Sequence, residues 1–143
     1  MSLPFYISCP SPSVNLIELS DGRFQLTKQG PISPFMAGYH YLLVEHALGA
    51  FLSELDMPGV RCAPATIFNR GTKEEHHTHT RVFIAQFFRA DQIRDLLLED
   101  CRLLTMGDQY YFASPALKFS LEQARFKYLR FTEGLSEFAA NSN

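Results

Sequence analysis

The sequence is poor in cysteine and lacks the spacings that cysteine-dependent sites use. Its 143 residues include three cysteines, Cys9, Cys62 and Cys101, and no two of them form a CxxC pair. An odd, scattered set of this kind is typical of a reducing compartment and not of a disulfide-stapled secreted domain. Each cysteine is more simply a small buried hydrophobe than a nucleophile. We therefore expect a cytoplasmic protein without a cysteine-based active site.

Long apolar runs and blocks of one charge are also absent. No run approaches the roughly 18 apolar residues of a membrane span, and residues 1–8 lack the cationic start and apolar core of a signal peptide. The 13 Lys and Arg residues against 15 Asp and Glu give a net charge of −2, without a basic cluster to neutralise phosphates. We therefore expect neither a membrane nor a nucleic acid as partner.

Motifs for nucleotide and acyl-transfer chemistry are missing too. The chain has no GxxxxGK[ST] loop, no GxGxxG loop and no GxSxG elbow. Its paired carboxylates, Glu74-Glu75 and Glu99-Asp100, fall in segments expected at the surface, where solvation explains them. The sequence therefore predicts no catalytic residue and no cofactor.

What the chain does have is the composition of a globular protein. Apolar residues make up 46% of it, including 13 Phe and 6 Tyr, which is enough for a hydrophobic core. Its length lies near the common size of one domain. We expect a single domain over residues 1–143.

Residues 1–37 are punctuated by prolines, which exclude long helices and central strands and favour short extended pieces. Strands are expected at 5–9, 15–19 and 23–26. The last two flank Ser20-Asp21-Gly22, and an Asp-Gly pair favours the positive φ of a tight hairpin turn. The prolines are Pro4, Pro10, Pro12, Pro31 and Pro34.

The pattern changes within residues 39–62, which predict a strand, a helix and a strand. The apolar run 41–44 is too short for a helix, whereas residues 47–55 carry apolar side chains at near-helical spacing. Pro58-Gly59 favours the end of that helix. A second strand is expected at 60–62.

Residues 108–131 repeat this order. A strand is expected at 110–113, Ser114 and Pro115 favour a helix start with the serine as N-cap, and a strand follows at 129–131. The two segments align without gaps and keep the apolar stripe of the helix, as Leu48 and Leu52 match Leu117 and Leu121. This predicts an internal duplication, although two unrelated segments that happen to align remain the alternative. The helices are expected at 47–55 and 115–125.

Between these units we expect a polar, histidine-rich loop at 69–80, a strand at 82–88 and a short helix within 91–104. Ile93, Leu96 and Leu97 suit one helix face, although Arg102-Leu103-Leu104 could equally be a strand. The fold class predicted for the whole chain is α+β, with a mostly antiparallel sheet and the two related strand–helix–strand units packed as one domain.

The densest group of metal-ligating residue types is Glu74-Glu75-His76-His77-Thr78-His79. In a strand, His77 and His79 would point to one face and could share zinc, nickel or iron. The alternative is a solvated loop or hairpin tip whose histidines are merely exposed. Residues that could complete a metal site are Glu75, His76, His40 and His46.

Tyrosines flank both units and suit two roles. They could anchor a protein interface or pack in the core and across strands. They are Tyr39, Tyr41, Tyr110, Tyr111 and Tyr128.

The second unit, Tyr111-Phe112-Ala113-Ser114-Pro115-Ala116-Leu117 to Leu129-Arg130-Phe131, resembles a broad family of small bacterial immunity proteins. Members of that family sit beside polymorphic or contact-dependent toxins and block them by direct binding. The resemblance covers roughly residues 31–138. It implies stoichiometric inhibition of a cognate toxin without a cofactor, through a surface that differs between members.

The sequence therefore favours a non-enzymatic protein-binding protein of the immunity type, with a cognate toxin as partner. One alternative is a metal-binding protein or metal-dependent enzyme that uses His77 and His79. Another is a homo-oligomeric structural protein, because the surplus of Phe and Tyr could serve self-association as a homodimer.

Overall fold

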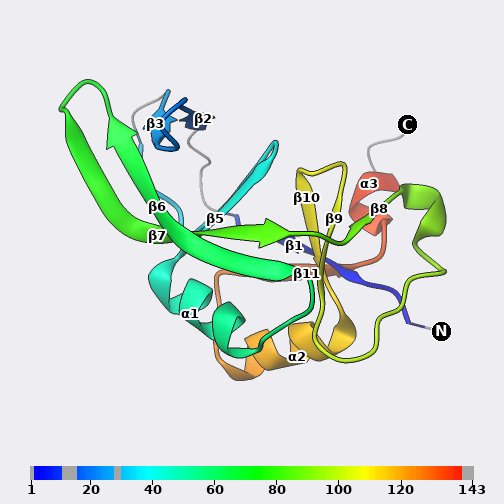
Figure 1. Cartoon of the computed structure of the whole chain (residues 1–143). Helices are drawn as coiled ribbons and strands as arrows, with labels where there is room; N and C mark the ends of the chain where they lie inside the picture. Colours follow the sequence, from blue (N-terminus) through cyan, green and yellow to red (C-terminus); the bar gives the residue numbers. More distant parts are fainter. Residues whose placement is uncertain (1, 11–15, 28–29, 140–143) are drawn as a thin grey trace.

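The computed structural model describes residues 2–10, 16–27 and 30–139, which form a mixed α and β structure with two sheets (Figure 1). The α+β class is confirmed, but the strands divide between a six-stranded and a five-stranded sheet instead of forming one.

The six-stranded sheet has the strand order β2-β3-β6-β7-β5-β4. Only the pair β3–β6 is parallel; the other four pairs are antiparallel. Its strands are β2 (Leu16–Glu18), β3 (Phe24–Leu26), β4 (Phe35–Gly38), β5 (Tyr41–Glu45), β6 (Val60–Asn69) and β7 (Glu74–Ile84). The long β6–β7 hairpin extends away from the body of the molecule (Figure 1).

The five-stranded sheet has the order β11-β1-β10-β9-β8, in which only β8–β9 is parallel. Its strands are β1 (Phe5–Ser8), β8 (Phe87–Phe88), β9 (Leu103–Met106), β10 (Tyr110–Ala113) and β11 (Arg130–Glu133). A short helix, α3 (Ser136–Ala139), follows β11.

Two longer helices connect strands within these sheets. Helix α1 (His46–Glu54) joins β5 to β6, and α2 (Pro115–Gln123) joins β10 to β11. Since β5 and β6 are both antiparallel to β7, and β10 and β11 are both antiparallel to β1, each helix joins two parallel strands that flank one antiparallel strand. The strand, helix and strand expected in each segment are therefore confirmed.

Local signals for these elements act as expected. Ser114 caps α2 by accepting from the Leu117 amide at 3.4 Å, with proline in the first turn. Gly59, with φ +71, lies in the turn after α1, and Gly22, with φ +89, lies in the β2–β3 turn.

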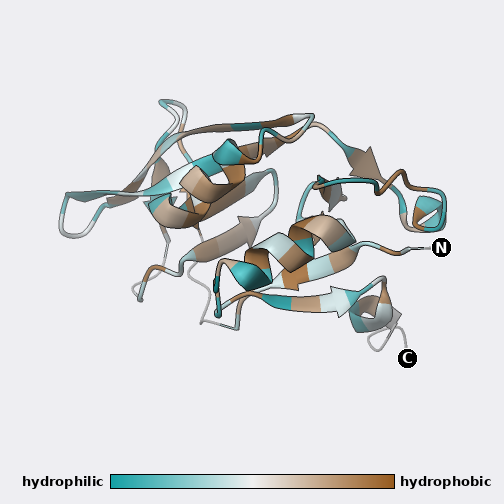
Figure 2. Ribbon diagram, turned by 90° about the horizontal axis from the view of Figure 1, so that it is seen from below, coloured by the Kyte–Doolittle hydropathy of each residue, from teal (hydrophilic) through white to brown (hydrophobic). Residues whose placement is uncertain are grey.

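The main core lies where both helices cover the sheets. Leu48 and Leu52 of α1 and Leu117 and Leu121 of α2 belong to one buried cluster that also includes residues of both sheets. Figures 1 and 2 show both helices on the same side of the molecule. The opposite face of the six-stranded sheet has a second, smaller core beneath the β2–β3 hairpin.

Two expectations about the middle of the chain are wrong. The loop expected at 69–80 is mostly strand, because β7 pairs with β6 along its length and only residues 70–73 connect the two. The helix expected within 91–104 is a single 3-10 turn, Ala90–Gln92, followed by irregular chain and β9. Its apolar residues do not form one buried face, since Leu97 is 63% exposed.

Two expected strands have different bounds. The strand expected at 82–88 is divided between the end of β7 and the two-residue β8. The strand expected at 15–19 begins at Leu16, and Asn15 lies outside the described residues.

Candidate functional site

A β-bulge in the β6–β7 hairpin controls where the histidines point. Ala65 pairs with His79 and Ile67 pairs with His76, so two residues of β7, His77 and Thr78, oppose one residue of β6. Such an insertion interrupts the alternation of side chains along a strand.

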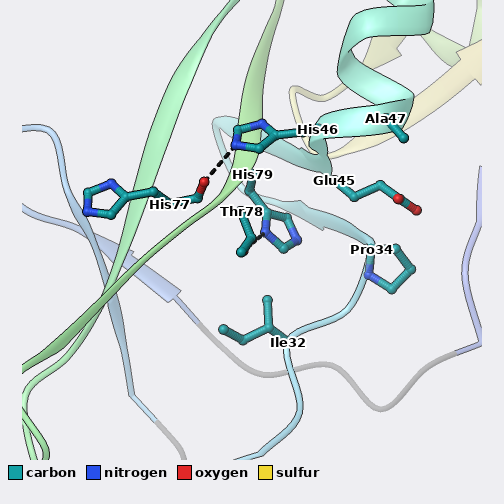
Figure 3. Close-up of a pocket in the computed structure, with 8 residues that line it drawn as sticks. All are labelled: Ile32, Pro34, Glu45, His46, Ala47, His77, Thr78 and His79. Carbon is teal, nitrogen blue, oxygen red and sulfur yellow. Dashed lines mark hydrogen bonds between the residues drawn. The ribbon is translucent and has the colours of Figure 1, made fainter.

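The expectation that His77 and His79 share one face is therefore wrong. The register places His79 and His76 on the side of Ala65 and Ile67, which are both buried. His79 is itself buried, at 4% exposure, whereas the His77 side chain is 67% exposed. In Figure 3 the two imidazoles point apart.

His79 is a structural link between β7 and the chain before β4. Its Nε2 lies 2.8 Å from the main-chain oxygen of Ser33, so Nε2 carries the proton and donates. Its Nδ1 lies 2.9 Å from Thr78 Oγ1. Burial lowers the pKa of His79, and the hydrogen bond to Ser33 opposes this only in part. We therefore assign a neutral imidazole at neutral pH, with Nδ1 accepting from the Thr78 hydroxyl.

His46, the first residue of α1, fixes the same bulge from the other side. Its Nε2 donates to the main-chain oxygen of His77 at 2.6 Å, and its Nδ1 lies 3.0 Å from Thr80 Oγ1. The sequence named His46 only as a distant candidate. No local pattern could show that α1 begins beside the bulge, because that depends on the pairing of β5 with β7.

These histidines line a pocket of about 520 Å³ between α1, β7 and the chain before β4 (Figure 3). The pocket is lined by the polar residues Glu45, His46, His77, Thr78 and His79 and by the apolar residues Ile32, Pro34 and Ala47. Burial and the nearby Glu45 carboxylate both raise the pKa of Tyr128.

The part of the chain that the structure describes contains no group of three or more His, Cys, Asp or Glu residues arranged to hold a metal ion. Both nitrogens of His79 and of His46 are in hydrogen bonds. His77 lies 3.5 Å from Glu75 Oε1. Metal binding by His77 and His79 stays a prediction, and it would require these hydrogen bonds to rearrange.

The other residues singled out in the sequence are dispersed. His40 Nδ1 is hydrogen-bonded to the Asp108 carboxylate where the turns of the β4–β5 and β9–β10 hairpins meet, and neither residue lines the histidine pocket. The three cysteines are partly buried and unbridged. Of the five flanking tyrosines, Tyr39 is exposed, at 62%, whereas Tyr111 is buried, at 3%.

A second polar feature, absent from the sequence-based candidates, is a row of alternating arginine and phenylalanine side chains. Arg61 lies over the ring of Phe83 at 4.0 Å, and Arg81 lies 4.6 Å from the same ring and 5.2 Å from that of Phe24. We call these four residues the Arg–Phe row. Arg81 and Phe83 are two residues apart on β7, and the pairing of strands brings Arg61 of β6 and Phe24 of β3 to them.

The central arginine of this row is held on both sides. Arg81 forms an ion pair with Glu18 at 2.8 Å and donates to the main-chain oxygen of His40 at 3.1 Å. Its side chain is 18% exposed. These contacts fix the orientation of the Arg81 side chain.

Comparisons of the chain with protein-family models, curated proteins and solved structures found no match. Among the described residues, no helix has the length and apolar character needed to span a bilayer.

Proposed function

We propose that this protein acts by binding another protein, as an immunity protein that neutralises a cognate bacterial toxin without catalysis. The observation that carries the proposal is the Arg–Phe row, in which Arg61, Arg81 and Phe83 lie at the end of the β6–β7 hairpin away from its tip and stack around buried Phe24 of β3. Arginine and aromatic residues are the side chains most often found as energetic anchors of protein interfaces.

The row suits that role because its conformation is already fixed. Immobilising a free arginine at an interface costs about 0.5–1.5 kcal/mol of side-chain entropy. Arg81 is already held by Glu18 and by stacking on two rings, which supports an ordered surface before association.

An exposed aromatic side chain extends this surface. Tyr39 is 62% exposed, and its ring lies 3.7 Å from the imidazole of His40, the residue whose main-chain oxygen accepts from Arg81. His40 has φ +70, an unfavourable conformation for a residue with a side chain, and its contacts with Arg81 and Asp108 maintain it. Tyr39 thus presents an exposed aromatic side chain on a turn whose backbone is fixed, which suits a protein interface.

The histidine pocket is consistent with the same proposal. Both ring nitrogens of His46 and His79 are in hydrogen bonds, which tie the bulge to α1 and to the chain before β4. Their engagement favours a structural role for the cluster.

We also propose that residues 39–62 and 108–131 are related units. Each contains a helix that joins two parallel strands flanking one antiparallel strand, which supports a common origin. The intervening strand is β7 in the first unit and β1 in the second.

The test of function begins with the neighbouring genes. We expect a toxin domain to be encoded beside this chain, to co-purify with it and to lose its growth inhibition when both are expressed. Phe83→Ala, within the Arg–Phe row, should weaken capture and rescue. Phe119→Ala is the matched control, because Phe119 is 61% exposed on α2 and outside the row. An isolated gene, or an adjacent toxin that is neither bound nor neutralised, would refute the proposal.

A further inference from the structure

The first half of β6 has a strand neighbour on one side only. It pairs with β7 from Val60 to Ala65, but its pairing with β3 is confined to Ile67 and Phe68. Over residues 60–65, no other strand of the described chain pairs with it. This stretch is an open sheet edge, and we call it the β6 edge.

The register shows which main-chain groups face outward along this edge. Gly59 accepts from the Ala85 amide at 2.7 Å, and hydrogen-bonded residues alternate along an antiparallel pair. Residues 61, 63 and 65 therefore face β7, and residues 60, 62 and 64 face outward. The Val60 amide bonds to Met57 at 3.3 Å, and proline has no amide proton, so Cys62 supplies the outward donor while Val60, Cys62 and Pro64 supply carbonyl acceptors.

The position of Pro64 agrees with this assignment. Proline is tolerated in a strand where its nitrogen faces away from the ladder. Pro64 is also exposed, as expected at an edge. Because Pro64 has no amide proton, it limits pairing of the edge with a second copy of the chain, but the Pro64 carbonyl remains available as an acceptor.

Two hollows flank the β6 edge. One, of about 330 Å³, lies between the edge and α1, where α1 presents His46, Gly49, Ala50 and Ser53 toward Cys62 and Pro64. The other, of about 390 Å³, is lined by Arg61 and Phe83 together with Val60, Ile84, Gly59 and Ala85. Successive side chains of an added strand point to opposite faces, so hollows on the two sides of an edge can receive alternate residues.

The charge of Arg61 indicates the chemistry of one residue of the added strand. Arg81 and Arg23 have carboxylate partners, Glu18 and Glu75. Arg61 is exposed and stacked on Phe83, and it forms no ion pair with any described residue. Its guanidinium group is thus oriented by the ring with its donors left for a carboxylate from outside the chain.

We propose that the β6 edge is a strand-addition site for an extended segment of a protein partner. The segment places a small apolar side chain in the hollow beside α1 and an acidic side chain against Arg61. Main-chain hydrogen bonds to Cys62 and Pro64 hold it to the edge. This inference rests on the proposed function, because it says where and how the partner binds.

The test uses the full chain and a probe that needs no knowledge of the toxin, a phage-displayed library of random linear heptapeptides. We expect the enriched peptides to alternate apolar and acidic residues. N-methylation of alternate amides in a synthetic copy should weaken binding at least about tenfold, the effect of losing an interface anchor.

Two variants locate the binding. Ala50→Arg fills the hollow beside α1, and Arg61→Glu reverses the charge, so each should weaken peptide binding at least about tenfold. Matched controls are Ala116→Arg, an exposed alanine on α2, and Arg130→Glu, an exposed arginine on β11; both should bind as the wild type does. Circular dichroism checks that all four variants fold.

The inference is overturned if no peptide is enriched, if N-methylation has no effect, or if the peptides bind Ala50→Arg and Arg61→Glu as tightly as the controls. The proposed function can fail separately. A toxin captured equally well by wild type, Ala50→Arg and Arg61→Glu would retain the function and refute this site. Peptides that bind the edge when no adjacent toxin is captured would support this site and refute the proposed function.

Discussion

The hydroxyl of Tyr111 on β10 donates a hydrogen bond to the main-chain oxygen of Tyr41 on β5, across 2.9 Å. This bond joins the two sheets. Burial, foremost, and then the Asp108 carboxylate raise the pKa of Tyr111, so the hydroxyl keeps its proton well above neutral pH. Beside it the His40 amide bonds to the Asp108 main-chain oxygen at 2.8 Å, so the tips of the two hairpins are linked as well.

Tyr111→Phe should therefore destabilise the fold. The substitution removes a buried donor but little volume, and we expect the free energy of unfolding to fall by about 1–2 kcal/mol. Urea denaturation measures this. Tyr110→Phe, on the adjacent and only partly buried side chain, is the control; an equal loss in both variants would argue against the Tyr111–Tyr41 bond as the cause.

Much of the fold was predictable because its signals are local. The Asp21-Gly22 turn, the Ser114-Pro115 helix start and the apolar stripe of α2 depend on neighbours within a few residues. The helix expected within 91–104 rested on the spacing of Ile93, Leu96 and Leu97, but Leu97 is 63% exposed. The alternative strand at Arg102-Leu103-Leu104 is closer to the structure, because Leu103 and Leu104 are buried in β9, which pairs with β10.

The candidate site was less predictable because it depends on register. The sequence placed His77 and His79 on one face, and one inserted residue in β7 separated them. His79 bonds to Ser33, 46 positions away. Arg61 meets Phe83 only through the pairing of β6 with β7. Alternation along a strand predicts a face only where the ladder is uninterrupted.

Ser114 should contribute more than an ordinary helix cap. Its fully buried hydroxyl accepts from the Arg102 amide at 2.8 Å and donates to the Asp100 main-chain oxygen at 2.7 Å, in addition to capping α2. An N-cap alone is worth about 1 kcal/mol, and each additional buried group left unsatisfied adds about 1 kcal/mol or more. We expect Ser114→Ala to lower the unfolding free energy by about 2–3 kcal/mol.

The control for Ser114 is Ser136→Ala, which removes an exposed hydroxyl that bonds to Glu133 at 2.9 Å. Its loss should be much smaller, as measured by urea denaturation. Equal losses would mean that the bonds from Ser114 to residues 100 and 102 contribute nothing.

Gly49 allows α1 to approach β7. A Cβ at this position would lie 2.7 Å from Thr80 Cβ and Oγ1. Alanine normally stabilises a helix interior relative to glycine by about 0.5–1 kcal/mol, but here we expect Gly49→Ala to destabilise by about 1–3 kcal/mol through overpacking. A double-mutant cycle with Thr80→Gly measures the contact, and additive effects would contradict it.

Metal removal should leave stability unchanged. Both ring nitrogens of His79 are in hydrogen bonds, and His77 points away from it. We expect protein purified without a histidine tag to contain no stoichiometric metal, and neither EDTA nor His77→Ala to shift its Tm. Bound zinc, nickel or iron that His77→Ala releases would instead support the metal site.

Mild acid should destabilise the fold through His79. Burial lowers the pKa of His79 in the folded state, whereas an unfolded histidine titrates near about pH 6.5. Below that pH the unfolded chain takes up a proton that folded His79 resists. The contribution of His79 is therefore present above about pH 6.5 and is lost as the pH falls through the folded pKa.

Urea denaturation of wild type and His79→Gln between about pH 7.5 and pH 5 isolates this contribution. The wild type should lose stability as the pH falls, and the variant, although less stable at pH 7.5, should lose less. His77→Gln is the matched control: its side chain is 67% exposed, and it should keep the wild-type pH dependence because His79 remains. If His79→Gln and wild type lose stability in parallel, the buried imidazole is not the group that titrates, and the assignment of a neutral His79 holding Ser33 would be wrong.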